Sequence, residues 1–253
     1  MFPYRDDNPT ELPAIVTVGI IAANVLAWLF VQGMGSPEPL VRSVCDLGLV
    51  PGEILRTAKP GSGVELAPGL FCLVGAPRYA TLITSMFMHG GWLHLIGNMV
   101  FLWVFGNNIE DVMGHGRFLV FYLVCGVAAA ATQMLMGPNS VVPMVGASGA
   151  ISGVLGAYLL LYPRVRVHTL LFLGFYVTTV ALPAYVMLGY WALLQLMGGL
   201  VSLSGVDRGG TAFFAHVGGF AAGLILIRLF ASEDALRRRP QPPSSYYRSR
   251  TYG

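Results

Sequence analysis

The sequence predicts an all-α, polytopic membrane protein whose helices form a bundle of six transmembrane spans. The 253-residue chain is 55% apolar and 11% charged, with a mean hydropathy of +0.66, whereas a water-soluble domain normally carries about 25% charged residues. No Asp or Glu occurs between Val112 and Val206. The basic residues are separated by apolar runs of about 17–25 residues, which is the length of a bilayer-spanning helix.

Taken in order, the predicted spans are 13–33, 91–109, 117–136, 147–162, 183–203 and 212–231. The fifth span is the least clear, because its apolar sequence begins at 168 and is longer than one crossing requires. We expect Pro183 to divide this stretch into an interfacial piece, "HTLLFLGFYVTTVAL", and a transmembrane helix.

The chain is expected to have three parts. Residues 1–12 form an N-terminal segment, 13–232 form the membrane domain with a long loop at about 34–88, and 233–253 form a disordered basic tail rich in Arg, Pro and Ser. The net charge of +3 is concentrated in that tail and is not accompanied by a folded basic surface, so no nucleic-acid partner is expected. The acidic start of the chain does not resemble a cleavable signal peptide.

The distribution of basic residues near the span ends predicts the orientation. One side carries Arg5, Arg117, Arg164, Arg166, Arg228 and the arginines of the tail. The positive-inside rule then places both termini in the cytoplasm, in what we expect to be the plasma (inner) membrane, and places the 34–88 loop outside. Cys45 and Cys72 both lie in this loop, on the oxidising side. Their spacing alone leaves open a disulfide or two free thiols.

Polar side chains inside a membrane are costly, so each one requires an explanation. His94 and Asn98 are four residues apart on one face of the second span, and His89 lies just before it. Ser148 begins the fourth span and His216 lies in the sixth. In the predicted orientation, three spans bring polar groups to one depth in the outer part of the membrane.

Stripes of small residues flank the serine and the histidine. They consist of Gly149, Gly153 and Gly156 in the fourth span and Gly219 and Gly223 in the sixth. Such stripes let helix backbones approach closely. We therefore expect these two spans to pack together, near enough for a hydrogen bond between Ser148 and His216.

A serine becomes a good nucleophile when a base takes its proton, and histidine is the usual base. The spans contain no carboxylate that could complete a triad, so the pattern favours a Ser148–His216 dyad. Asp207, nine residues before His216 in an outer loop, is a minor candidate for a third member. Asn98, His94 and the Ser148 backbone N–H can supply donors to a tetrahedral oxyanion.

Simpler explanations exist for each of these features. A membrane serine often bonds to a carbonyl of its own helix, while single His or Asn residues and glycine stripes often serve helix packing. The three histidines match no standard zinc spacing, so neither a metal nor another cofactor is expected. A transporter should show intramembrane charges or inverted repeats, and neither is evident in the sequence.

Together the motifs resemble the rhomboid family of intramembrane serine proteases, over about residues 80–232. "HGGWLHLIGN" is similar to the family's H-x4-H-x3-N element, "GASG" resembles its G-x-S-G motif, and "AHVGGFAAG" resembles its A-H-x-x-G-x-x-x-G element. "GNNIEDVMG", in which Glu110 caps the end of the second span, also fits. The resemblance implies that Ser148 is the nucleophile, that His216 is the base, and that His94, Asn98 and His89 support the oxyanion.

The resemblance implies a serine endopeptidase that cleaves the transmembrane or juxtamembrane segments of other membrane proteins. The alternative is a rhomboid-fold pseudoenzyme that binds membrane clients without cutting them, which the presence of both Ser148 and His216 disfavours. The family often has a tyrosine stacked on the histidine, four residues after the serine, and Ser152 stands there instead. The imidazole must then be oriented by the Ser152 hydroxyl or by neighbouring helices. The family's frequent Trp-Arg pair in the first outer loop is replaced by "PRYATL".

Overall fold

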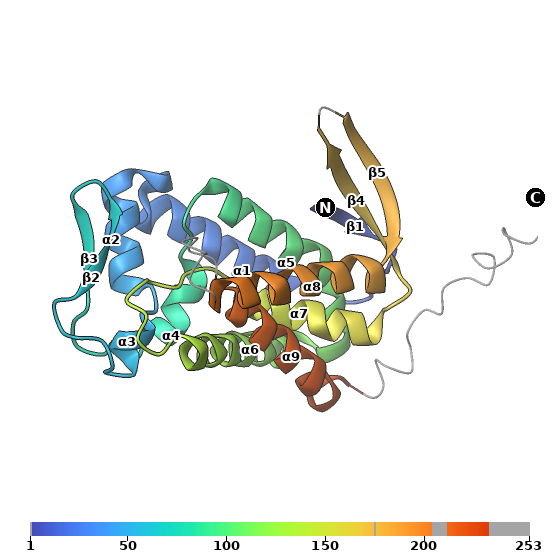
Figure 1. Ribbon diagram of the computed structural model, residues 1–253. Helices are drawn as coiled ribbons and strands as arrows, with labels where there is room; N and C mark the ends of the chain where they lie inside the picture. The colour runs from blue at the N-terminus through green and yellow to red at the C-terminus, as the bar shows by residue number, and fades with distance from the viewer. Residues whose placement is uncertain (1, 175, 204–211, 233–253) are drawn as a thin grey trace, which may run out of the picture.

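The computed structural model describes residues 2–174, 176–203 and 212–232 (Figure 1). Each predicted span corresponds to a helix. These helices are α1 (Ile15–Leu26), α5 (Trp92–Met113), α6 (His115–Met136), α7 (Ser148–Leu161), α8 (Ala184–Leu203) and α9 (Phe213–Phe230). The first continues through a π-helical turn, Ala27–Val31.

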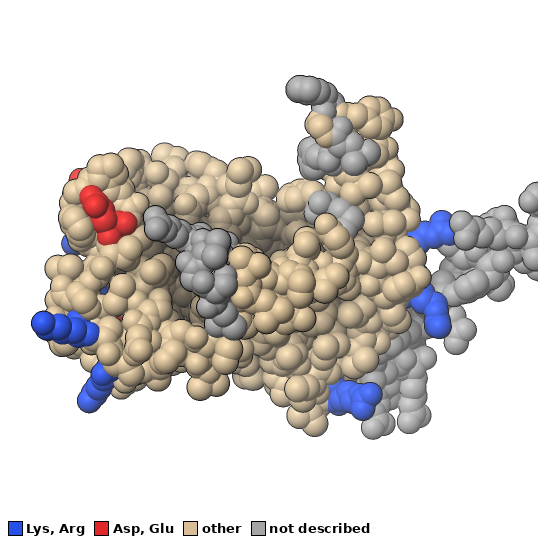
Figure 2. Space-filling view, in the orientation of Figure 1, with Lys and Arg blue, Asp and Glu red and all other residues tan. Residues whose placement is uncertain are grey.

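Among the described residues, three helices are long and apolar enough to cross a membrane on their own: His115–Met136, Ala184–Ser202 and Phe213–Phe230. Ile15–Val31 and Ser148–Leu161 are apolar but shorter. On the face shown in Figure 2, the coloured charged side chains lie towards the two ends of the bundle, and the surface between them is uncharged. These features are those of an integral membrane protein, while the count of six spans stays a prediction.

Helices α7 and α9 touch backbone to backbone along their glycines. A Cβ atom added to Gly223 would overlap the carbonyl oxygen of Gly153, and one added to Gly219 would overlap that of Gly149. On α7, a Cβ atom at Gly156 would overlap the carbonyl of Phe220. Larger side chains at these positions would push the two helices apart, so the stripes determine how near the starts of α7 and α9 can come.

The prediction of an all-α fold is wrong for the segment between α7 and α8. Strands β4 (Arg166–Leu173) and β5 (Tyr176–Pro183) form an antiparallel hairpin, and β1 (Phe2–Asp6) pairs with β4. The stretch expected to be one interfacial piece therefore belongs to a three-stranded sheet with the order β1-β4-β5. Valines and threonines favour strands, and Gly174 provides a left-handed φ of 64° at the turn.

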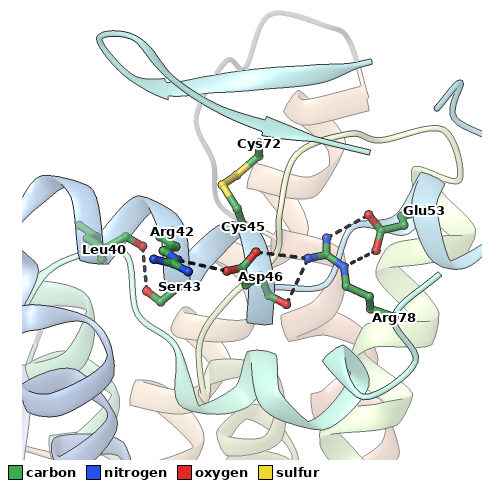
Figure 3. Close-up of a disulfide and its surroundings, with 8 residues drawn as sticks. All are labelled: Leu40, Arg42, Ser43, Cys45, Asp46, Glu53, Cys72 and Arg78. Atoms are coloured by element: carbon green, nitrogen blue, oxygen red, sulfur yellow. Dashed lines mark hydrogen bonds and ion pairs between the residues drawn. A yellow bond between two sulfur atoms is a disulfide. The ribbon is translucent and has the colours of Figure 1, made fainter. Parts of the chain in front are cut away.

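The long loop after the first span is ordered by several short elements. These are α2 (Pro37–Leu47), α3 (Pro51–Ile54), β2 (Gly63–Ala67), β3 (Leu70–Leu73), α4 (Thr81–Thr84) and the 3₁₀ turns Gly33–Gly35 and Ser85–Phe87. The question left open by the cysteine spacing is answered, because a disulfide joins Cys45 of α2 to Cys72 of β3 (Figure 3).

A two-pronged ion pair also holds this loop. Arg78 of the "PRYATL" segment donates from Nε to Glu53 Oε1 at 2.7 Å and from Nη2 to Glu53 Oε2 at 3.0 Å (Figure 3). Burial alone would raise the pKa of Glu53, but the hydrogen bonds from Arg78 and from the Gly75 N–H outweigh it and lower that pKa below its usual value. The segment that lacks the family's Trp-Arg pair thus has its own anchor.

Glu110 caps a different helix from the one expected. Its carboxylate accepts hydrogen bonds from the backbone N–H groups of Val16 and Thr17, both at 2.8 Å, at the start of α1. The first N–H groups of a helix have no partner within the helix, so a carboxylate from α5 satisfies them. The 233–253 tail lies outside the described residues.

Candidate active site

Ser148 is the first residue of α7, where the chain leaves the loop that follows α6. Two residues earlier, Gly146 has a φ of 122°, a conformation that residues with a side chain rarely adopt. A Cβ atom there would lie 2.7 Å from His94 Nε2. The first glycine of "GASG" therefore serves both the turn and the close approach of His94 to the serine's loop.

His216 of α9 lies within hydrogen-bond distance of the serine. Its Nε2 atom is 2.7 Å from Ser148 Oγ. The two residues are 68 positions apart in the chain, and the glycine contacts between α7 and α9 bring them together. A histidine nitrogen at this distance can take the hydroxyl proton, which is what activation of a serine nucleophile requires.

The other imidazole nitrogen has a partner that the sequence analysis missed. His216 Nδ1 lies 2.7 Å from Oε1 of Gln195 in α8. One turn earlier on the same helix, the Trp191 ring packs against the imidazole, with centroids 5.9 Å apart. Ser152 does not orient the ring, because its hydroxyl donates to the Ser148 carbonyl at 2.6 Å.

Asn98 and His94 of α5 lie close to Gly146 in the serine's loop. The Asn98 side-chain nitrogen is buried and has no hydrogen-bond partner among the described residues, so this donor is available to an incoming group. His94 Nδ1 accepts a hydrogen bond from the Gly90 N–H at 3.3 Å, which leaves Nε2 directed at Gly146.

His89 is buried behind His94 and does not line the cavity at the serine. The two imidazole rings meet edge to face with centroids 5.1 Å apart. The His89 backbone is fixed by Gln32, whose side chain accepts from its N–H and donates to its carbonyl, both at 2.8 Å. Any contribution of His89 to the site is therefore made through His94.

A cavity of about 350 Å³ opens between these helices. Ser148, His216, His94 and Asn98 all contribute to its lining. Much of the remaining wall consists of small residues, which include Gly97, Gly126, Ala129, Ala130, Gly149 and Ala150. Within the described part of the chain, no group of three or more His, Cys, Asp or Glu residues could hold a metal ion. Asp207, the minor candidate for a third member, falls outside that part.

Comparison with known proteins gives the same family as the motifs. The model of the Rhomboid domain matches residues 76–233, more than half of the chain. Rhomboid protease GluP of Bacillus subtilis is 31% identical over 151 residues, which is 60% of this chain and 26% of that protein. RHOMBOID-like protein 4 of Arabidopsis thaliana is 32% identical over 145 residues, 57% of this chain and 32% of that protein.

Rhomboid-like protease 5 of Toxoplasma gondii is 32% identical over 150 residues, 57% of this chain and 15% of that protein. The matched region is thus less than a third of the length of these three relatives. It includes Ser148, His216, His94 and Asn98, which line the cavity. By its family match, this chain is a member of the rhomboid family.

Proposed function

We propose that the protein is an intramembrane serine protease that uses Ser148 as the nucleophile and His216 as the general base. The observation that carries this proposal is the 2.7 Å approach of His216 Nε2 to Ser148 Oγ at the wall of a cavity between membrane helices. The names of the GluP and Toxoplasma relatives, which describe proteases, support it.

In the proposed reaction, His216 Nε2 takes the hydroxyl proton while Ser148 Oγ attacks a peptide carbonyl. The resulting oxyanion needs donors, which Asn98 Nδ2, His94 Nε2–H and the Ser148 N–H at the start of α7 can provide. His216 then returns the proton to the leaving amine, and water releases the acyl group by the same steps in reverse.

The substrates in this proposal are transmembrane or juxtamembrane segments of other membrane proteins. A carbonyl inside a regular helix is already hydrogen-bonded, so the substrate helix must open before attack. The small side chains around Ser148 favour a small residue such as Ala or Gly before the cut. We propose that both termini lie in the cytoplasm and that cleavage occurs towards the outer face, as the basic residues predict.

The test uses the purified protein in detergent or nanodiscs with a model transmembrane substrate and a serine-directed fluorophosphonate. We expect adduct formation at Ser148 and cleavage by the wild type, and neither in Ser148→Ala or His216→Ala variants that keep the wild-type melting temperature. Cleavage by Ser148→Ala would falsify the proposed nucleophile. A folded wild type that binds the segment but neither cleaves it nor reacts would indicate the pseudoenzyme.

A further inference from the structure

We infer that Gln195 is a positioning residue that holds His216 in its reactive tautomer, an inference that rests on the proposed function. A neutral imidazole carries one proton, and Nε2 can act as a base only when that proton is on Nδ1. The Nδ1 atom faces Gln195 Oε1 at 2.7 Å, and an amide oxygen can only accept a hydrogen bond.

The opposite assignment of the amide would also fit the distance to the serine, but it would be incompatible with the proposed reaction. If the Gln195 nitrogen faced Nδ1, the ring proton would move to Nε2, which would then donate to Ser148 Oγ and could not receive its proton. Only the arrangement Gln195 Oε1···H–Nδ1 and Nε2···H–Oγ Ser148 leaves both contacts satisfied and the base free. The proposed reaction therefore requires this tautomer, and both distances fit it.

A glutamine suits this position better than the carboxylate of a water-soluble triad. A charged side chain within a membrane helix is costly, whereas a neutral amide supplies the same acceptor without a buried charge. Ser152 stands where the family often has a stacking tyrosine, but its hydroxyl is already hydrogen-bonded to the Ser148 carbonyl. Gln195 and the Trp191 ring therefore supply the orientation from α8.

The position of α8 is set by its contact with α9. A Cβ atom on Gly198 would overlap the Phe213 ring, and one on Gly199 would lie 3.2 Å from the Phe214 ring. The two glycines lie one turn after Gln195 and receive the aromatic rings at the start of the helix that carries His216. Close packing at this point keeps the amide within reach of the imidazole.

The experiment compares Gln195→Met with Gln195→Glu. Methionine keeps the length and removes the acceptor, so kcat and the fluorophosphonate labelling rate should fall about 10–100-fold, the effect of losing a hydrogen bond to a charged group, with KM nearly unchanged. Glutamate retains an acceptor and should recover most of the loss. Leu194→Met, which changes an exposed neighbour on α8, should retain wild-type rates.

A spectroscopic measurement separates this inference from the proposed function. The ¹⁵N spectrum of the five histidines, with the His216 signals assigned by their loss in His216→Asn, reports the tautomer directly. We expect an Nδ1–H form in the wild type and loss of that preference in Gln195→Met. An unchanged tautomer and labelling rate in Gln195→Met would overturn the role of Gln195. If the wild-type protein were not labelled at Ser148, that result would instead overturn the proposed protease activity.

A second inference concerns the β4–β5 hairpin, which projects beyond the helices at the end of the bundle that carries the N-terminus (Figure 1). Strand β1 pairs with β4 only as far as Leu170, so the outer half of the hairpin has two strands. Its sequence from 170 to 177 is "LLFLGFYV". Tyr176 is 67% exposed and Val177 is 52% exposed.

Charge is confined to the base of this hairpin. His168 Nε2 lies 2.8 Å from Asp7 Oδ1 and 3.4 Å from Arg5 Nη2. Strand β5 ends at Pro183, and α8 begins at the next residue as a candidate span, so the base of the hairpin lies where the chain enters the membrane. The hairpin runs across the helix direction, which keeps its apolar tip near the same depth (Figure 1).

We propose that the hairpin lies in the headgroup region of the bilayer and binds lipid through its apolar tip. A two-stranded hairpin is marginally stable in water, and an open strand edge such as that of β5 is not tolerated in the hydrocarbon core. The interface satisfies both constraints, because it offers apolar contact together with partners for backbone groups. Tyrosine is also enriched at this level of membrane proteins.

The test places a nitroxide spin label at Val177→Cys in nanodiscs, in a Cys125→Ala background. Ile225→Cys, 70% exposed on α9, serves as the lipid control, and Glu38→Cys, at an exposed position of α2, serves as the water control. We expect Val177→Cys to be more accessible to oxygen than to a nickel chelate. Nickel accessibility equal to that of Glu38→Cys would overturn the proposal. Strong dipolar coupling between copies would overturn it too, because a second chain would then occupy the hairpin.

Discussion

Asn98 combines burial with an unused hydrogen-bond donor. Its side-chain nitrogen has no partner within the described part of the chain, and the residue lines the cavity at Ser148. Leaving a buried donor unpaired costs about 1–3 kcal/mol, so the arrangement is unfavourable for stability unless the donor serves a ligand. An oxyanion formed at the serine would supply the missing acceptor.

We therefore expect Asn98→Ala to lower kcat about 10²–10³-fold, the usual effect of removing one oxyanion donor, while KM changes little. The melting temperature should be unchanged or higher, because the substitution removes an unpaired polar group. Steady-state kinetics and thermal unfolding in the same detergent measure the two quantities. Ile96→Ala, an exposed change on the same helix, is the matched control. A wild-type kcat with a lowered melting temperature would show that Asn98 serves packing.

Sequence reasoning reached some residues of the cavity and not others for a physical reason. Ser148, His94 and Asn98 are polar residues within apolar runs at helical spacing, so their cost in a membrane drew attention to them. Gln195 is equally polar, but α8 contains no second amide, histidine or charged residue that would draw attention to its face. Its contact with His216 depends on how α8 packs on α9, which no local pattern encodes.

The positions of the helices followed from the lengths of the apolar runs and from the residues that end them. Helix α8, the fifth predicted span, begins directly after Pro183, where the sequence predicted a break. Helix α7, the fourth predicted span, begins at Ser148 within the glycine-rich stretch. The approach of α7 to α9 was also expected from the glycine stripes, since small residues at helical spacing favour backbone contact.

The hairpin was not predictable as a sheet from the same signals. A short apolar run suits a buried strand or a helix segment equally well, and only β-branched content favours a strand. The alternation that identifies a half-buried strand is absent from "LLFLGFYV". The pairing of β4 with β1 joins residues more than 160 positions apart, so it depends on the packed bundle and not on local sequence.

Across the molecule, the half-buried carboxyl group of Asp6 links the N-terminal segment to the bundle. Asp6 Oδ2 accepts hydrogen bonds from Asn108 Nδ2 of α5 at 2.9 Å and from the Tyr158 hydroxyl of α7 at 2.5 Å. Asp6 also pairs with Val167 in the sheet. A segment that the sequence presents only as the acidic residues before the first span thus joins two helices and a hairpin.

Burial raises the pKa of Asp6 from 3.8 to about 6, against the opposing effect of the hydrogen bond from Tyr158. Because the folded state binds this proton more tightly than the unfolded state, its contribution to stability is complete below about pH 4 and is lost as the pH rises through about 6. The contribution is roughly 1–3 kcal/mol, allowing for partial exposure of the carboxyl.

Asp6→Asn should remove this pH dependence, because an amide keeps an acceptor for Asn108 and Tyr158 and does not ionise. We expect the variant to melt at a higher temperature than the wild type at pH 7.5, and the difference to shrink towards pH 4.5 as Asp6 becomes protonated. Thermal unfolding across this pH range, followed by tryptophan fluorescence, measures this difference in melting temperature.

The effects of other titrating groups cancel in the comparison of the variant with the wild type. The control variant Glu38→Gln, at an exposed position of α2, should leave the wild-type curve of melting temperature against pH unchanged. A constant difference between Asp6→Asn and the wild type at every pH would show that Asp6 acts through its shape and hydrogen bonds alone. The proton on its carboxyl group would then have no part in holding the N-terminal strand to the bundle.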